Sequence, residues 1–379
     1  MTDPLKSWVL LLAMGFVLAF QQATGQPVEN GPWQSLFNGE DLSGWTERNG
    51  DHIFEARDGQ IVGTTVPGQP NGFLTTDETF GDFILELEVN VDVLMNNSGI
   101  QFRSLSHAGY RDFRVHGYQA EIDTKPQRWS GSIYDEARRG WLYVTELNPA
   151  SKSAFVNNTW NHYRIEAIGT TNRVWVNGIP TAHLIDDETT RGFIGLQLHA
   201  NNPDDPPGSH QIRFRNIRIQ TQNLRPSPLD DLFVVNLIPN HLSAQERAQG
   251  FTLLWDGQDT GGWSGADGAS FAETGWVAVD GELRTSPASS DALSARHGFD
   301  AFELKFDFRP LEEGAVCGIR YRSHDPADDD GVGDVPVTSP YCRMASQKID
   351  REAWNQGFIR VRPDRRVEYW LNGHLILEY

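Results

Sequence analysis

The stretch FILELEVNV at residues 83–91 alternates apolar residues with acidic or polar ones. Because successive side chains of a strand point to opposite sides, a two-residue period predicts a strand with one buried face. Similar alternation recurs in HYRIEAIG (162–169), RVWVNG (173–178) and HQIRFRNIRIQ (210–220). A one-residue slip at Asn216 in the last of these predicts a β-bulge. Many short strands separated by turns predict an all-β protein built as an antiparallel sandwich.

Helical periodicity is nearly absent from the chain. The one segment that shows it is HLSAQERAQ (241–249), where Ser243 stands at an N-cap position. A short helix is therefore expected there, outside the strands.

The chain contains one ordered set of motifs twice. Residues 36–65 and 254–286 share the skeleton L-[FW]-[ND]-G-x-D-x-x-G-W, followed by a strand pattern and D-G-x-[IL]. Two more pairs of segments match in the same order: 81–104 with 300–323, and 160–184 with 354–379. A period of this length indicates tandem domains and not a solenoid of small units. We expect domains at 33–221 and 251–379, joined by a linker at 222–250.

The second copy is shorter than the first. It lacks a counterpart of the stretch from AEID to SGSIYDE (120–136) and of the closing segment 191–220. We therefore expect the second sandwich to be incomplete. Since an open sheet edge invites aggregation, either the chain is a fragment or a partner covers this edge.

The first 25 residues are organised like a secretory signal peptide. Lys6 supplies the positive start, residues 8–20 are apolar, and residues 23–25 are small enough for cleavage. This apolar run is short for a membrane span of ~20 residues. We expect a secreted or periplasmic protein with no membrane span in its mature form.

The net charge limits the classes of binding partner, and the two cysteines allow two redox states. The formal net charge of −19 argues against nucleic acid and anionic membranes as partners. It fits neutral or cationic ligands, or solubility alone. Cys317 and Cys342 either form a disulfide in an exported protein or remain two buried thiols, and the sequence leaves both open.

Three expected strands of the first copy each carry a polar pair on one face. The pairs are Gln101 with Arg103, Glu121 with Asp123, and Gln197 with His199. The stretch that follows Asp123 adds Trp129, Tyr134 and Asp135. A polar sheet face beside aromatic rings is typical of sugar binding. Each residue also has a simpler interpretation: Arg103 pairs with Glu121 at the surface, or His199 is a hydrogen-bonded strand end.

The Glu121/Asp123 pair has two further interpretations. With His199, the two carboxylates have the chemistry of ligands for a hard divalent cation. The pair also resembles the E-x-D-x-x-E strand of laminarinase-like glucanases, which needs a third carboxylate for acid-base catalysis. Residues 124–127 supply none, so direct hydrolysis of an unmodified glycoside lacks a required group.

Seven spaced motifs of residues 33–220 resemble the 3-keto-disaccharide hydrolase domain family, and 251–379 resembles it in part. They are LFNGEDLSGW, NSGIQFRS, GYQAEID, SGSIYD, WNHYRIEAIGTTNRVWVNG, GFIGLQLH and IRFRNIRI. The resemblance implies two tandem concanavalin A-like jelly-roll sandwiches, the second incomplete. The family's motifs fall on Asn97–Ile100, on Glu121 and Asp123, and on Gln197 and His199.

The resemblance also implies a glucoside already oxidised to a ketone at C3. Such a ketone acidifies the C2 proton, so that a base can remove it, the aglycone can leave C1, and water can add. We expect Glu121, Asp123, His199 and Arg103 as catalytic residues, with Glu121 or His199 as the base and Arg103, Tyr134 or a bound cation at the enolate oxygen. Gln101, Trp129, Tyr134 and Gln197 are expected to bind substrate. A non-catalytic lectin-like carbohydrate-binding module and a structural surface domain remain as alternatives.

Overall fold

The computed structural model describes residues 31–92, 97–206, 208, 210–265, 267–285, 292–295, 298–310, 318–321, 333–336, 353–364 and 366–378. Strands dominate these residues, which confirms the all-β expectation. Helical structure is limited there to α1 (Ala244–Ala248) and short 3-10 turns, including η1 (Thr145–Leu147). Ser243 caps α1 as expected, in a capping box with Glu246. The segment expected to be a signal peptide and both cysteines lie outside the described residues.

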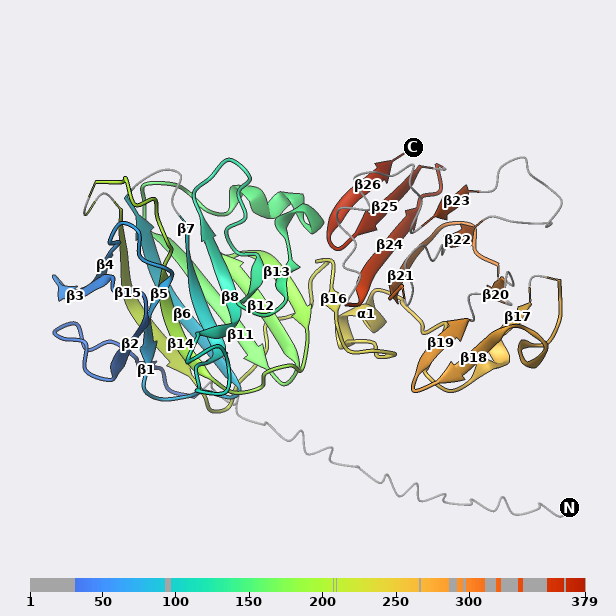
Figure 1. The fold of residues 1–379 in the computed structure, drawn as a ribbon, viewed down its shortest axis with the longest axis horizontal. Coiled ribbons are helices and arrows are strands. Elements are labelled where there is room, and N and C mark those ends of the chain that lie inside the picture. Colours follow the sequence, from blue (N-terminus) through green and yellow to red (C-terminus); the bar gives the residue numbers. More distant parts are fainter. Residues whose placement is uncertain are drawn as a thin grey trace, which may run out of the picture.

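The first copy is a sandwich of two antiparallel sheets (Figure 1). The larger sheet contains β16 (Val235–Asn236), β13 (Ile179–Ile185), β12 (Thr171–Val176), β11 (Asn161–Ile168), β6 (Phe83–Val91), β15 (Gln211–Gln220), β4 (Gln60–Thr64) and β3 (Ile53–Arg57) in that order, with β1 (Gln34–Ser35) beside β15. The smaller sheet contains β10 (Gly140–Tyr143), β9 (Ile133–Glu136), β8 (His116–Asp123), β7 (Asn97–Leu105), β14 (Phe193–Leu198), β5 (Gly72–Thr76) and β2 (Trp45–Asn49). All pairings are antiparallel except that of β16 with β13.

The core lies between the two sheets and follows the alternation of the sequence. Leu85, Leu87 and Val89 of β6 pack into it, while Glu86 and Glu88 face outward. Burial of such apolar area contributes about 25 cal/mol per Å² to folding. The outward carboxylates pair with arginines of the neighbouring strands.

Glu86 joins three strands on the outer face of the larger sheet. Its carboxylate accepts hydrogen bonds from Arg164 of β11 at 2.7 Å and Arg218 of β15 at 2.6 Å. Hydrogen bonds from His162, Arg218 and Arg164 lower the pKa of Glu86 to about 2. The acidic and basic positions of the alternating strands therefore pair across the sheet.

The last two strands of the first copy, β14 and β15, each lie between strands from earlier in the chain. β15 lies between β4 and β6 in the larger sheet, and β14 lies between β5 and β7 in the smaller one. The register of β15 against β6 shifts between Arg215 and Arg218, and Asn216 has a φ of 53°. The bulge predicted at Asn216 is confirmed.

The second copy repeats part of this arrangement. Its strands are β17 (Trp263–Gly265), β18 (Trp276–Val279), β19 (Glu282–Thr285), β20 (Leu293–Ala295), β21 (Phe302–Phe308), β22 (Gly318–Tyr321), β23 (Gly333–Pro336), β24 (Asn355–Val361), β25 (Val367–Leu371) and β26 (His374–Glu378). The sheet β21-β24-β25-β26 has the order of β6-β11-β12-β13, whereas β17-β20, β18-β19 and β22-β23 are separate pairs. In the described part of this copy, no strand takes the places of β14 and β15.

The segment expected to be a linker packs against both copies. β16 adds to the edge of β13, and Phe233 contacts Phe358 of β24 with ring centroids 4.7 Å apart. Lys305 of β21 donates hydrogen bonds to the Val234 carbonyl at 2.7 Å and to Glu246 at 2.9 Å. These contacts join the two copies through residues of the segment between them (Figure 1).

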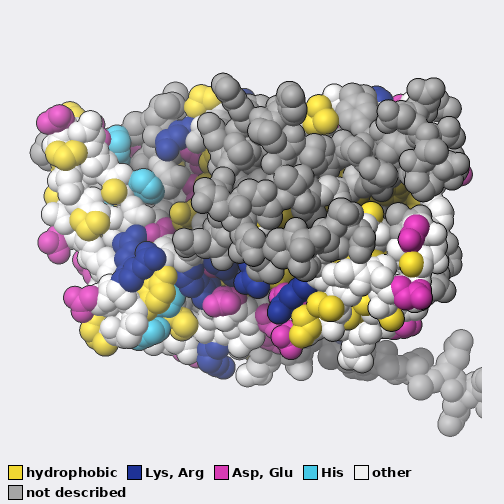
Figure 2. Space-filling view, turned by 45° about the vertical axis from the view of Figure 1, so that its right-hand side comes forward, with side chains coloured by type: hydrophobic (Ala, Val, Ile, Leu, Met, Phe, Trp, Pro, Cys, Tyr) yellow, Lys and Arg dark blue, Asp and Glu magenta, His cyan; other side chains and the backbone are white. Residues whose placement is uncertain are grey.

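The surface carries charges of both signs. On the face drawn in Figure 2, Lys and Arg side chains form small groups beside acidic ones, wherever the atoms are not grey.

Within the residues that the structure describes, no helix is both long and apolar enough to span a membrane.

Candidate functional site

β8 places a row of polar side chains on the outer face of the smaller sheet. Tyr118, Ala120 and Ile122 point into the core, so Gln119, Glu121 and Asp123 point the other way. The expectation that Glu121 and Asp123 share one face is confirmed.

The neighbouring strands add to this row. Gln101 of β7 lies opposite Gln119, and Tyr134 of β9 lies on its other side. We call the side chains of Gln101, Gln119, Glu121, Tyr134, Glu136 and Gln197 the polar face.

Glu121 is nearly enclosed, with only 2% of its surface exposed. Gln119 Nε2 donates to its Oε2 at 2.9 Å, and Asn97 Nδ2 donates to its Oε1. Burial raises the pKa of Glu121 to about 8, and the charges of Asp123 and Glu136 act in the same direction. The two amide donors oppose this rise without cancelling it. Glu121 is therefore mostly protonated at neutral pH and ionises just above it.

A chain of amides orients Gln119 toward Glu121. Gln101 Nε2 donates to Gln119 Oε1, and Ser104 Oγ donates to Gln101 Oε1 at 2.8 Å. Gly99 leaves room for this arrangement, because a Cβ there would lie 2.2 Å from Gln119 Cδ. The glycine in NSGI thus permits a side chain to lie flat across β7.

Asp123 holds a loop and does not point at a ligand space. Its Oδ1 accepts a hydrogen bond from the Lys125 amide at 3.1 Å, and its Oδ2 accepts one from the Trp129 amide at 3.5 Å. Ser130 Oγ accepts from the Asp123 amide at 2.8 Å. Asp123 therefore positions the loop that carries Trp129.

Three aromatic rings form a group beside the polar face. Trp141 lies 4.7 Å from Trp129 and 4.8 Å from Tyr134, centroid to centroid, with edge-to-face geometry in both pairs. Trp129 Nε1 donates to Glu146 at 3.0 Å, which fixes the indole. All three rings are partly exposed and so can contact a ligand. We call them the aromatic group.

Glu136 belongs to the polar face although the sequence interpretation overlooked it. It is buried at the end of β9 and accepts hydrogen bonds from Arg114 at 2.5 Å, Asn71 at 3.3 Å and Gln197 at 3.5 Å. Alternation along SIYDE pairs Tyr134 with Glu136, and this signal would have found it.

Asp135, which the sequence interpretation had chosen, points to the opposite side of β9. It is buried there and pairs with Arg138 at 2.8 Å and with Arg139 at 2.6 Å. It therefore takes no part in the polar face.

Gln197 and His199 have different surroundings. Gln197 is buried on the polar face, where it donates to Glu136. His199 follows the end of β14, is half-buried, and hydrogen bonds through Nδ1 to the Ala200 carbonyl at 2.7 Å. In the described residues its ring has no hydrogen bond to Glu121 or Asp123, so their convergence with His199 is not seen.

Arg103 lies elsewhere, which corrects the expectation that it joins Glu121. The register of β7 shifts between Phe102 and Leu105, and Arg103 has a φ of 46°, so the alternation breaks at this residue. Its side chain is 0% exposed. It donates to Asp82 at 2.9 Å and to the Gly81 and Gly169 carbonyls at 3.1 and 2.8 Å. Arg103 is a structural residue, and its ionic partner is Asp82 and not Glu121.

The described residues do not fit the divalent cation that the sequence left as one interpretation of Glu121, Asp123 and His199. They contain no group of three or more His, Cys, Asp and Glu side chains arranged to hold a metal. The Glu121 oxygens accept from two amides, and the Asp123 oxygens accept from backbone amides of its own loop. We derive no step through a metal.

The family model of the 3-keto-alpha-glucoside-1,2-lyase-like domain matches residues 32–220 and 250–379. The chain belongs to this family. Its two matched segments agree with the tandem arrangement read from the motifs. No curated protein matches the chain.

Three solved structures are similar to about half of this chain. A candidate glycosyl hydrolase from Parabacteroides distasonis is 17% identical with a TM-score of 0.37, and covers 50% of this chain and 94% of its own. A carbohydrate binding module from Bacillus subtilis is 16% identical with a TM-score of 0.35, and covers 47% and 95%. A galectin-like protein from the same organism is 11% identical with a TM-score of 0.34, and covers 51% and 97%. Likeness this low carries no argument about activity.

Proposed function

We propose that the first copy is an exported enzyme that cleaves the glycosidic bond of 3-keto-glucosides, such as 3-keto-disaccharides. Glu121 carries the proposal, because a buried carboxyl whose pKa is raised to about 8 lies on a polar sheet face beside partly exposed aromatic rings. Groups whose pKa lies near the working pH are suited to proton transfer. The lyase-like description of the family supports the same class of reaction.

The proposed reaction begins with ionised Glu121 as the base. It takes the proton from C2, and the electron pair of that C–H bond forms an enolate with the C3 carbonyl. The enolate then collapses to restore the ketone and form the C1–C2 double bond, while the bond from C1 to the aglycone oxygen breaks. Addition of water across C1–C2 gives the 3-keto sugar. Each proton released to the base returns to the aglycone or to C2.

Neighbouring side chains have supporting roles in this proposal. Tyr134 can donate its hydroxyl proton in a hydrogen bond to the enolate oxygen, and burial raises its pKa so that the proton is retained. Trp129 and Trp141 offer faces and edges for the apolar side of a sugar ring. Gln101, Gln119 and Gln197 supply amide groups for orientation.

Release of free sugar from 3-keto-trehalose or 3-keto-sucrose is the direct test. Wild-type protein should produce sugar with and without a chelator, and Glu121→Gln should lower turnover by about 10²–10⁴-fold. Glu47→Gln is the matched control, because Glu47 is an exposed glutamate of the same sheet. Equal turnover by Glu121→Gln and wild type would contradict the assignment.

The aromatic group supports a second candidate, a carbohydrate-binding module without catalysis. Its three partly exposed rings suit sugar stacking whether or not a bond is broken. Glycan binding that depends on Trp129, with no turnover of any 3-keto-glucoside, would favour this alternative.

The remaining proposals concern the whole chain. We propose that a signal peptide ends near residue 25, that the domains span 33–221 and 251–379, and that a partner covers the open edge of the second copy. The second copy lacks the segment that carries Glu121, so we propose that it is a scaffold or binding module. Mass spectrometry of exported protein that begins at Met1 would contradict the signal peptide.

A further inference from the structure

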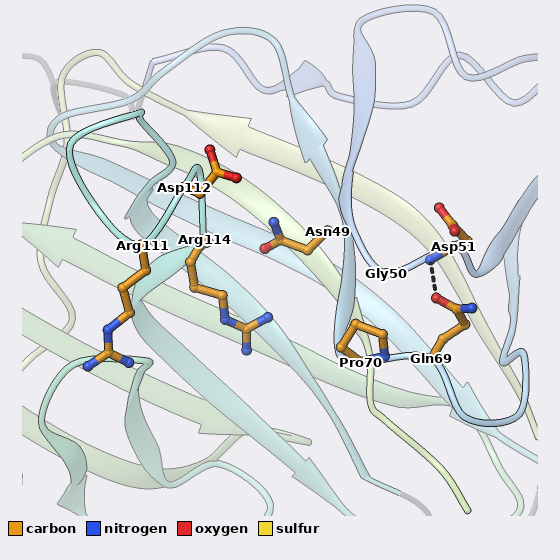
Figure 3. A pocket seen from close by; sticks show the side chains of 8 residues that line it. All are labelled: Asn49, Gly50, Asp51, Gln69, Pro70, Arg111, Asp112 and Arg114. Carbon is orange, nitrogen blue, oxygen red and sulfur yellow. Dashed lines mark hydrogen bonds between the residues drawn. The ribbon is translucent and has the colours of Figure 1, made fainter. Parts of the chain in front are cut away.

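A hollow of about 460 Å³ opens at the rim of the smaller sheet, away from the aromatic group. Its lining residues are Asn49, Gly50, Asp51, Gln69, Pro70, Arg111, Asp112 and Arg114 (Figure 3). Figure 3 shows residues 49–51, 69 and 70, from the end of β2 and the approach to β5, on one side, and residues of the loop between β7 and β8 on the other. Asn49 and Arg114 point toward each other across this space. We call this hollow the rim pocket. Its volume falls in the range of ~300–1,000 Å³ found for small-molecule sites.

The lining chemistry of the rim pocket suits a neutral, hydroxyl-rich ligand. Two guanidinium groups stand with two carboxylates and two primary amides, and Pro70 is the one apolar side chain of the set. Equal numbers of positive and negative groups give no net attraction for an ion. The mixture of donors and acceptors matches sugar hydroxyls, each of which both donates and accepts.

The loop that forms one wall is held in an unusual backbone conformation. Arg111, Asp112 and Phe113 are three successive residues with φ of 42°, 52° and 60°. Non-glycine residues rarely adopt positive φ, and such strain concentrates at functional sites. Asn49, itself at φ 59°, holds the loop: its Nδ2 donates to the Phe113 carbonyl at 3.1 Å, and its Oδ1 accepts from the Val115 amide at 2.8 Å.

Hydrogen bonds link the wall of the rim pocket to Glu136 of the polar face. Arg114 lines the pocket and donates to Glu136 at 2.5 Å. Asn71, next to Pro70 of the pocket wall, donates to the same carboxylate at 3.3 Å. Glu136 in turn accepts from Gln197. Glu136 therefore contacts both the polar face and the wall of the rim pocket.

We propose that the rim pocket is the subsite for the leaving sugar of a 3-keto-disaccharide, and so determines specificity for the aglycone. This inference rests on the proposed function, in which the oxidised ring lies over Glu121. Two rim residues have groups available for the leaving sugar. Gln69 uses Oε1 to accept from the Asp51 amide at 3.1 Å, which leaves its Nε2 to donate. The Arg111 guanidinium lies 5.4 Å from the centroid of the Tyr110 ring and has no salt bridge in the described residues.

The test compares two substrates on the same variants. Arg111→Ala and Gln69→Ala should each raise KM for a 3-keto-disaccharide about tenfold, the loss expected for one or two hydrogen bonds. Turnover of methyl 3-keto-glucoside, which has no leaving sugar, should not change. Arg57→Ala, an exposed arginine of β3, is the control. Unchanged KM for the disaccharide, or equal losses on both substrates, would overturn the proposal.

Direct binding separates this inference from the proposed function. Saturation-transfer NMR with the unoxidised disaccharide should show contacts with wild-type protein that weaken in Arg111→Ala and persist in Arg57→Ala. That outcome supports the pocket even if wild-type protein has no turnover, in which case the proposed function alone fails. Binding that is absent from wild type, or equal in Arg111→Ala, overturns the subsite. Circular dichroism melting confirms that each variant is folded.

Discussion

If Glu121 is the base, kcat/KM should rise with pH and level off above the pKa of this carboxyl. That pKa is about 8, because burial disfavours the charged form more than the amides of Gln119 and Asn97 favour it. Two units below it, at pH 6, about 1% of Glu121 is ionised, so activity should be about 100-fold below the plateau. The assay is sugar release from one 3-keto-disaccharide between pH 5.5 and 9.5, at substrate well below KM.

The Asn97→Ala variant tests the cause of this profile. It removes a hydrogen bond that stabilises the ionised carboxylate, so the inflection should move upward by about one unit. Glu121→Gln should leave residual activity with no inflection near 8. A flat wild-type profile, or an inflection that persists in Glu121→Gln, would refute the assignment of the base.

Three other predictions concern stability and geometry. Near pH 8, Glu121→Gln should unfold at a higher urea concentration than wild type. The pKa of Glu121 is about 8 in the folded state and near 4.5 in the unfolded state, so wild type loses stability as the pH rises between these values. At pH 4 the difference between the two urea midpoints should be negligible, and equal midpoints at both pH values would contradict the prediction. Glu86 should have the opposite effect on the free energy of unfolding, because its folded pKa of about 2 lies below its unfolded value. Ionised Glu86 stabilises the fold by up to about 3 kcal/mol, and this stability is lost as the pH falls from 4.5 toward 2. Glu86→Gln should therefore reduce the fall of the urea midpoint at acid pH, and an unchanged fall would count against the prediction. Arg103→Ala should cost about 3 kcal/mol or more in urea unfolding while the pH inflection stays in place, and a shifted inflection would return Arg103 to the site.

The strands of this fold could be predicted because their sequence period is local. The alternation in FILELEVNV gave the buried and outward faces of β6, and the slip at Asn216 gave the bulge in β15. The same two-residue period placed Glu121 and Asp123 on one face. These features depend on neighbours in the chain, which a single sequence contains.

The errors in the site have equally specific causes. The two-residue period of SGIQFRS predicts that Arg103 shares a face with Gln101 and so lies beside Glu121. The bulge in β7 interrupts this period at Arg103 itself. Asn71 and Arg114 reach Glu136 from loops far away in the chain, and no local pattern in either loop points to a carboxylate. Loops that converge through the fold cannot be read from periodicity.

The late position of β14 and β15 has a consequence for how the chain acquires its fold. Until residues 193–220 exist, β4 has no neighbour that joins it to β6, and β5 has none that joins it to β7. β1 likewise needs β15, since Gln34 pairs with Ile219. Ribosomes add ~5–20 residues per second, so the open edges persist for on the order of ten seconds or more during synthesis. Contacts between such distant residues also close slowly. Both sheets of the first copy can therefore close only once the last two strands are present, and a nascent chain halted before residue 193 would leave these edges open to holding chaperones.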